Sequence, residues 1–130
     1  MGRVEDTFKW CLVQGQKGDK HKGLRKVEKD YQSADEQIKK ADSDLITMQY
    51  LYEGDKTDWV ASTAFYAMYH SLLAIIYKLG YESRNQECTI TLIEKCILDK
   101  IINLEQRYVD MIRTLQEGID DAKTIREEMQ

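Results

Sequence analysis

Residues 58–79 read DWVASTAFYAMYHSLLAIIYKL, and the nineteen residues 59–77 within this stretch carry no formal charge when His70 is neutral. Thr57 or Asp58 can cap the start of a helix here, and Gly80 supplies the left-handed residue that commonly ends one. The stretch therefore predicts a long helix at the centre of a bundle, buried on most of its sides. Its length also meets the crude criterion for a membrane span. Because its hydroxyl and imidazole groups make it too polar for lipid, we expect no membrane contact.

Four further segments repeat apolar residues at steps of three and four, the spacing of one helical face. The first covers residues 4–14 and stops at Gly15. The second follows a capping-box pair, Ser33 with Glu36, and ends near Gly54. The third follows the pair Ser83 with Gln86 and ends near Leu98. The last is a long helix in which Gly118 permits a kink or a break, and its apolar face is Leu104, Tyr108, Ile112, Leu115, Ile119, Ala122, Ile125 and Met129.

The composition agrees with this helical pattern. The 130 residues include no proline and only 7 glycines, so the usual turn residues of all-β folds are scarce. A chain of this length forms one core more readily than two. We therefore predict a single all-α domain over residues 1–130, an antiparallel bundle of four to five helices.

Charge is distributed unevenly along the chain. The net charge is −4, which disfavours general coating of nucleic acid. Residues 15–29 nevertheless hold six cations against two acids, and almost no apolar side chains. Such a segment buries too little surface to offset its ordering entropy, so we expect a mobile basic loop. The cations are Lys17, Lys20, Lys22, Arg25, Lys26 and Lys29.

The three cysteines, Cys11, Cys88 and Cys96, are an odd number. No secretory signal is expected in residues 1–9, which carry charges throughout. Free thiols in a reducing compartment fit both observations, so we predict a cytoplasmic protein without a disulfide.

Candidate binding groups are few. Tyr66, Tyr69 and His70 share one side of the apolar helix, so their hydroxyl and imidazole groups can line a cleft, although tyrosines at helical spacing are more often core residues. His21 and His70 lie far apart, without a carboxylate or cysteine at ligand spacing. We predict no metal and no cofactor, and neither Walker-type nor Rossmann-type glycine loops occur.

Two motifs suggest a family. Residues 58–70, with "YAMYH" at residues 66–70, and the turn "GYESRN" at residues 80–85 resemble the HEPN domain. The resemblance implies a helical bundle that forms a homodimer, often beside a minimal nucleotidyltransferase in a toxin–antitoxin module. Many such domains are metal-independent RNases, in which an arginine and, after four to six intervening residues, a histidine act at the dimer cleft.

The chain departs from that motif at the histidine. Arg84 and Asn85 match its start, but Thr89, Ile90 and Thr91 occupy the positions where the histidine is expected. Gln86 stands where some relatives have histidine, and an amide cannot exchange a proton near neutral pH. The tyrosine that partner transferases modify is also unmatched.

The resulting hypothesis is a homodimer, non-catalytic or weakly catalytic, that binds a nucleotidyltransferase partner or a nucleotide or RNA ligand. Its site would comprise Arg84, Asn85, Gln86, Tyr66, Tyr69 and His70. The first alternative is a metal-independent RNase toxin in which Arg84 holds phosphate and His70 transfers the proton. The second is a protein-interaction module that uses the basic loop.

Overall fold

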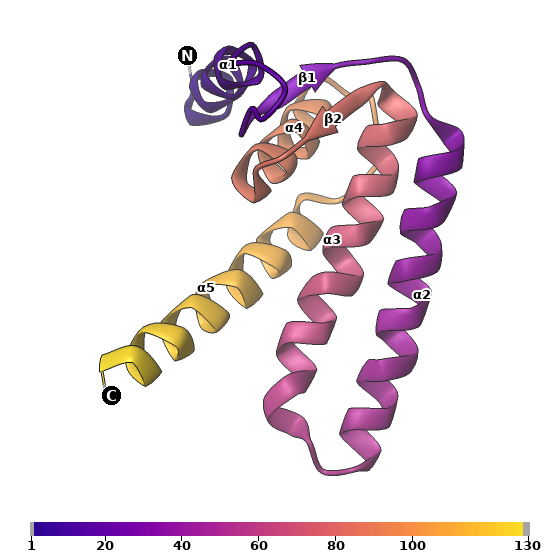
Figure 1. Cartoon of the computed structure of the whole chain (residues 1–130), viewed down its shortest axis with the longest axis vertical. Helices are drawn as coiled ribbons and strands as arrows, with labels where there is room; N and C mark the ends of the chain where they lie inside the picture. The colour runs from indigo at the N-terminus through magenta and orange to yellow at the C-terminus, as the bar shows by residue number, and fades with distance from the viewer. Residues whose placement is uncertain (1, 129–130) are drawn as a thin grey trace.

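The computed structural model describes residues 2–128, apart from the side chains of Ala122, Ile125 and Arg126. Helices α2 and α3 form a long antiparallel hairpin, α1 and α4 lie at one end of it, and α5 packs on α3 and extends away (Figure 1). The prediction of an all-α bundle is confirmed. In chain order the elements are α1 (Arg3–Gly15), β1 (Leu24–Lys26), α2 (Tyr31–Glu53), η1 (Thr57–Trp59), α3 (Val60–Leu79), β2 (Tyr81–Ser83), α4 (Gln86–Leu98) and α5 (Gln106–Glu128).

The apolar helix α3 ends as its sequence indicates. Gly80 has φ +87°, and its N–H bonds back to the last turn of the helix. A side chain at Gly80 would be strained by this φ and would lie 2.9 Å from the carbonyl oxygen of Val27. The glycine therefore both ends α3 and lets the backbone before α2 approach it.

Burial of α3 is more limited than predicted. The helix contacts α2, α4 and α5, and its fully buried residues alternate with half-buried ones. Trp59 and Tyr66 are exposed, so the expectation of burial on most sides is wrong. By length and composition residues 57–79 could cross a membrane, with a mean hydropathy of 1.3, but the core helix of a soluble bundle meets the same test.

Three of the predicted helix starts are displaced. Thr57 and Asp58 lie in η1, and α3 begins after Trp59 without a side-chain cap. Asp30, not Ser33, caps α2: its carboxylate Oδ1 accepts from the Ser33 N–H at 2.9 Å, so the helix begins earlier. Asn85 caps α4 in place of Ser83, which lies in β2. Helix α5 continues through Gly118 without a break. Met129 of its predicted apolar face lies outside the described residues.

The basic segment is more ordered than a mobile loop. Residues 24–26 pair antiparallel with residues 81–83, and Leu24 is fully buried. Two glycines explain the difference: a Cβ at Gly15 would lie 1.7 Å from Leu24 O, and one at Gly23 would lie 2.4 Å from Cys11 O. The glycines thus permit close backbone packing where the composition indicated flexibility.

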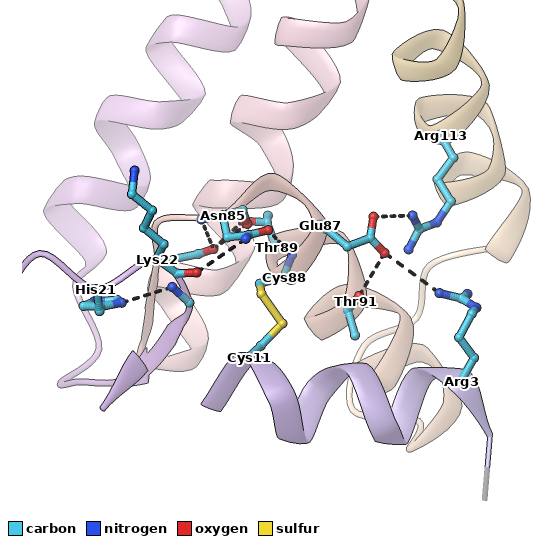
Figure 2. The surroundings of a disulfide bond; sticks show 12 residues. Arg3, Cys11, His21, Lys22, Asn85, Glu87, Cys88, Thr89, Thr91 and Arg113 are labelled. Carbon is cyan, nitrogen blue, oxygen red and sulfur yellow. Dashed lines mark hydrogen bonds and ion pairs between the residues drawn. A yellow bond between two sulfur atoms is a disulfide. The ribbon is translucent and has the colours of Figure 1, made fainter. Parts of the chain in front are cut away.

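The cysteine prediction is also wrong. Cys11 of α1 and Cys88 of α4 form a disulfide across 77 residues, and both side chains are buried (Figure 2). Only Cys96 is a free thiol in the described part of the chain. The fold brings α1 against α4, a contact that the spacing of cysteines along the sequence does not reveal.

Candidate functional site

The turn between β2 and α4 carries Arg84 and Asn85 and is held by main-chain contacts. The Arg84 N–H donates to Gly23 O at 3.0 Å, which continues the β1–β2 pairing by one bond. Asn85 then caps α4, its Oδ1 accepting from the Cys88 N–H at 3.1 Å. Strand, turn and helix start are therefore fixed relative to one another.

The N-terminal segment lies against this turn. The Arg84 guanidinium donates to the carbonyl of Asp19. The Asn85 side-chain amide donates to Lys22 O at 3.4 Å (Figure 2). Arg84 nevertheless keeps 46% of its side chain exposed. The exposed part of Arg84 therefore lies beside the segment that carries the lysines of residues 17–22, and Glu82 Oε1 lies 3.7 Å from its guanidinium.

The buried His21 forms a hydrogen bond with Glu82, the carboxylate beside Arg84. His21 Nδ1 accepts from the Gly23 N–H at 3.3 Å, so its Nε2 donates to Glu82 Oε1 at 2.6 Å. This hydrogen bond, helped by the charges of Arg84 and Arg25, lowers the pKa of the Glu82 carboxyl below its usual value.

The lowered pKa of Glu82 predicts a pH effect on stability. A carboxyl whose pKa is depressed on folding contributes stability above its unfolded pKa of about 4.3, and that contribution is lost as pH falls through the lower folded pKa. We expect the free energy of unfolding to fall more steeply below that pH in the wild type than in Glu82→Gln. Urea unfolding across a pH series measures the difference, and parallel pH curves for the two proteins would contradict it.

Tyr69 supports the same turn from within. Its hydroxyl and that of Thr89 are 3.0 Å apart, the Thr89 hydroxyl donates to Ser83 Oγ at 2.7 Å, and Ser83 Oγ donates to Asn85 O. Burial raises the pKa of the Tyr69 phenol. Tyr69 is therefore a positioning residue behind Asn85.

Tyr66 and His70 form a separate cluster on the α2 side of α3. His70 Nδ1 lies 2.6 Å from Asp44 Oδ2, and the Tyr66 ring stacks on the imidazole with centroids 6.2 Å apart. Between residues 2 and 128, no recorded hydrogen bond or ion pair joins His70 to Arg84, Asn85 or Gln86. The expectation that Tyr66, Tyr69 and His70 point the same way is wrong, because adjacent helical residues differ by about 100° in direction.

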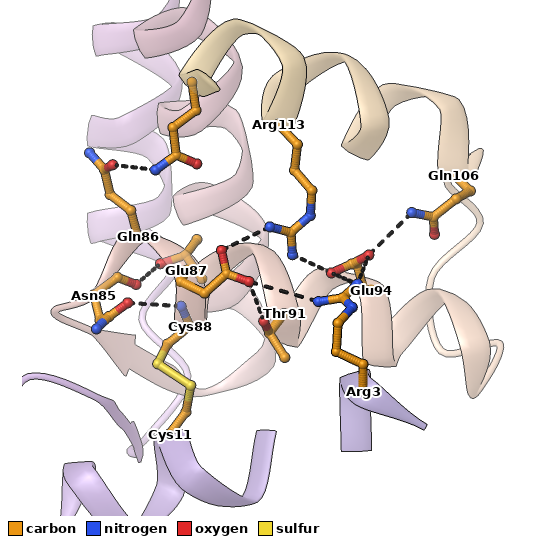
Figure 3. Close-up of polar contacts among 12 residues, drawn as sticks. Arg3, Cys11, Asn85, Gln86, Glu87, Cys88, Thr91, Glu94, Gln106 and Arg113 are labelled. Carbon is orange, nitrogen blue, oxygen red and sulfur yellow. Dashed lines mark hydrogen bonds and ion pairs between the residues drawn. A yellow bond between two sulfur atoms is a disulfide. The ribbon is translucent and has the colours of Figure 1, made fainter. Parts of the chain in front are cut away.

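Gln86 faces α5 at the exposed start of α4. Its Oε1 accepts from the Gln116 side-chain amide at 3.2 Å. Beginning at the next residue, Glu87, a group of charges joins α4 to α1 and α5 (Figure 3). Arg113 of α5 contacts Glu87 at 2.8 Å and Glu94 at 2.5 Å, and Arg3 of α1 contacts Glu94 at 3.3 Å.

Little in the spacing of residues along the chain predicts this ion cluster. Glu87 and Glu94 are seven residues apart, a spacing that places them on one helical face, but Arg3 and Arg113 come from distant parts of the chain. The described residues contain no group of three His, Cys, Asp or Glu side chains placed to hold a metal ion.

Comparison with known proteins identifies the family of this chain. The sequence model of the HEPN domain matches residues 34–127, most of the chain. The chain belongs to the HEPN domain family. Membership supports a function related to nucleotides or RNA in general. No similar curated protein and no similar solved structure was found.

The match divides this HEPN chain into two parts. Residues 34–127 include nearly all of α2 together with α3, β2, α4 and most of α5. Helix α1 and strand β1 precede the matched part, although they pack on it. Arg84 thus belongs to the family region, and the lysines beside it belong to the preceding segment.

The positions where the resemblance places a histidine are internal in this HEPN domain. Thr89, Ile90 and Thr91 are fully buried. Thr89 is engaged with Ser83 and Tyr69, and the Thr91 hydroxyl donates to Glu87 Oε1 at 3.4 Å. A proton-transferring group at the Arg84 turn must therefore come from another residue.

Proposed function

We propose that this HEPN domain binds the phosphates of RNA or of a nucleotide at the Arg84 turn and does not itself cleave RNA. The observation that carries the proposal is an exposed Arg84 fixed beside the cationic residues 17–22, without a histidine at residues 89–91. Arginine offers planar, paired donors that suit phosphate oxygens. An unprotonatable amide at Gln86 leaves the adjacent position without an acid–base group.

The shape of the basic segment supports this proposal. The Arg25 side chain donates to Gly15 O at 3.0 Å and to Gly18 O at 2.5 Å, which closes residues 15–25 into a compact turn. Lys17, Lys20 and Lys22 are exposed on that turn. Phosphate can replace the neutral Asp19 carbonyl as the acceptor of Arg84, because hydrogen bonds between ions are stronger than those to a neutral acceptor.

Replacing Arg84 tests the site. In Arg84→Ala we expect the dissociation constant for single-stranded RNA to rise roughly ten- to hundredfold, the usual cost of a lost charged hydrogen bond. Fluorescence anisotropy with a labelled oligonucleotide measures it.

Arg107→Ala is the matched control, because Arg107 is an exposed arginine on α5 that pairs with Glu105. Equal affinity of wild type and Arg84→Ala would reject Arg84 as a phosphate ligand. Equal losses in Arg84→Ala and Arg107→Ala would show that only net charge matters.

The partners remain part of the proposal. On the basis of the family resemblance, we infer a homodimer that acts with a minimal nucleotidyltransferase in a toxin–antitoxin setting. Light scattering of the purified chain tests the dimer, and a purely monomeric protein would contradict it. Co-expression with the transferase encoded beside this gene tests the partner.

A second candidate, RNase activity, is favoured by the Asp44–His70 pair. Asp44 holds Nδ1 of His70, an arrangement that leaves Nε2 to accept a proton. Incubating RNA with wild type, His70→Gln and Arg84→Ala separates the candidates. Turnover by the wild type that both variants lose would establish the RNase and reject the non-catalytic proposal.

A further inference from the structure

The Cys11–Cys88 disulfide joins the segment that precedes the family match to the helix that begins at the Arg84 turn. Cys11 lies in α1, before residue 34, and Cys88 lies in the first turn of α4. The Cys88 N–H is the donor that Asn85 accepts as helix cap. One covalent bond therefore connects α1 to the first turn of α4, four residues beyond Arg84.

The basic turn is held at both of its ends. Strand β1 anchors it on the C-terminal side through its pairing with β2. Helix α1 anchors it on the N-terminal side, and besides the disulfide its polar ties to the bundle include Lys95 with Glu5 at 2.8 Å and Arg3 with Glu94 at 3.3 Å. Ion pairs with exposed members contribute little individually. The disulfide is consequently the strongest single tie of α1.

We propose that this disulfide is a redox switch for phosphate binding: the oxidised form holds the basic turn against Arg84, and reduction releases α1 and weakens the combined site. The inference rests on the proposed function of the Arg84 turn. The cations of residues 17–22 act with Arg84 only while their backbone stays beside it, through the carbonyls of Asp19 and Lys22.

The chemistry is a thiol–disulfide exchange with a dithiol reductant. A thiolate of the reductant attacks one sulfur of the pair, the Cys11–Cys88 bond breaks, and the released cysteine thiolate takes up a proton. The second thiol of the reductant then displaces the other cysteine from the mixed disulfide. The reductant leaves as a cyclic disulfide, and two electrons have passed to the cysteines.

The surroundings of the three cysteines confine exchange to this pair. Cys96 is eight residues beyond Cys88 on α4, about 12 Å along the helix axis. Burial raises the pKa of the Cys96 thiol, which keeps it protonated and unreactive. Because Cys11 and Cys88 are fully buried, reduction requires α1 to lift, so it is slow in the intact fold.

The test compares the full chain before and after treatment with dithiothreitol. Intact mass identifies the oxidised and reduced forms, and limited proteolysis reports the release of α1. Anisotropy with labelled single-stranded RNA then measures affinity against salt. Loss of about two phosphate contacts predicts roughly tenfold weaker binding near physiological salt and a shallower salt dependence after reduction.

The control variants distinguish an effect of the Cys11–Cys88 disulfide from a failure of RNA binding at the Arg84 turn. Cys11→Ser should bind as the reduced wild type does under all conditions, and Cys96→Ser should respond to dithiothreitol as the wild type does. Equal affinity of both forms, or tighter binding after reduction, would overturn the switch while the proposed function stands. Absence of RNA binding in the oxidised form would reject the proposed function, and proteolysis would still show whether reduction frees α1.

Discussion

Replacing both Cys11 and Cys88 with serine is expected to lower the free energy of unfolding by about 4 kcal/mol. A disulfide limits the freedom of the unfolded chain, and the chain-entropy account gives about this value for a closed loop of 77 residues. In a domain of this size the loss corresponds to a fall in melting temperature of roughly 15 °C. Thermal and urea unfolding of the oxidised wild type and the double variant measure it.

Cys96→Ser is the matched control for the disulfide. It also exchanges a buried sulfur for a hydroxyl, but it leaves the link between α1 and α4 intact. We expect it to lose about 1 kcal/mol, from burial of a polar group. Equal melting temperatures for the oxidised wild type and the double variant would contradict the covalent link between α1 and α4.

Arg113→Met is expected to destabilise the fold by about 3 kcal/mol, in the range measured when one member of a buried ion pair is removed. Glu94 is only 7% exposed in its side chain, and without Arg113 the remaining cation paired with it among the described residues is Arg3. Glu87 loses its 2.8 Å contact as well. The methionine retains most of the volume, so the effect measures charge and not a cavity.

Arg107→Met is the control on the same helix. Arg107 pairs with Glu105, and both side chains are 66% exposed. Exposed pairs of this kind contribute about 0–1 kcal/mol. If urea unfolding showed equal losses for the two variants, the charges around Glu94 would have no special role in joining α1, α4 and α5.

Local signals in the sequence were sufficient to predict most of the helices. The uncharged stretch and Gly80 define α3 because helical spacing and a left-handed cap are properties of neighbouring residues. The first residue of each helix was harder to predict, since several residues near each start can act as the N-terminal cap. Asp30 and Ser33 both have suitable side chains, and the contact between them decides for Asp30.

Long-range contacts account for what the sequence did not indicate. The disulfide joins residues 77 positions apart, and an odd number of cysteines favoured free thiols. The composition of the basic segment predicts a flexible loop. Backbone packing at Gly15 and Gly23 orders this segment instead. In both places tertiary contact outweighed the local tendency.

The candidate site shows the same division. Arg84 and Asn85 were identified from the family resemblance, and the structure places them together on one turn. His70 and Tyr69 are adjacent in sequence but contact different helices, α2 through Asp44 and α4 through Thr89. No periodicity argument indicates which neighbouring helix each side chain meets.

The order of synthesis gives the α1–α4 contact a further consequence. At roughly 5–20 residues per second, Cys88 leaves the ribosome about 4 to 15 seconds after Cys11. During that interval the α2–α3 hairpin emerges, while α1 lacks its contact with α4, which is not yet made. Helix α1 is therefore fixed after α2 and α3 have been made, and oxidation of Cys11 with Cys88 marks a chain that has been translated at least through the first turn of α4.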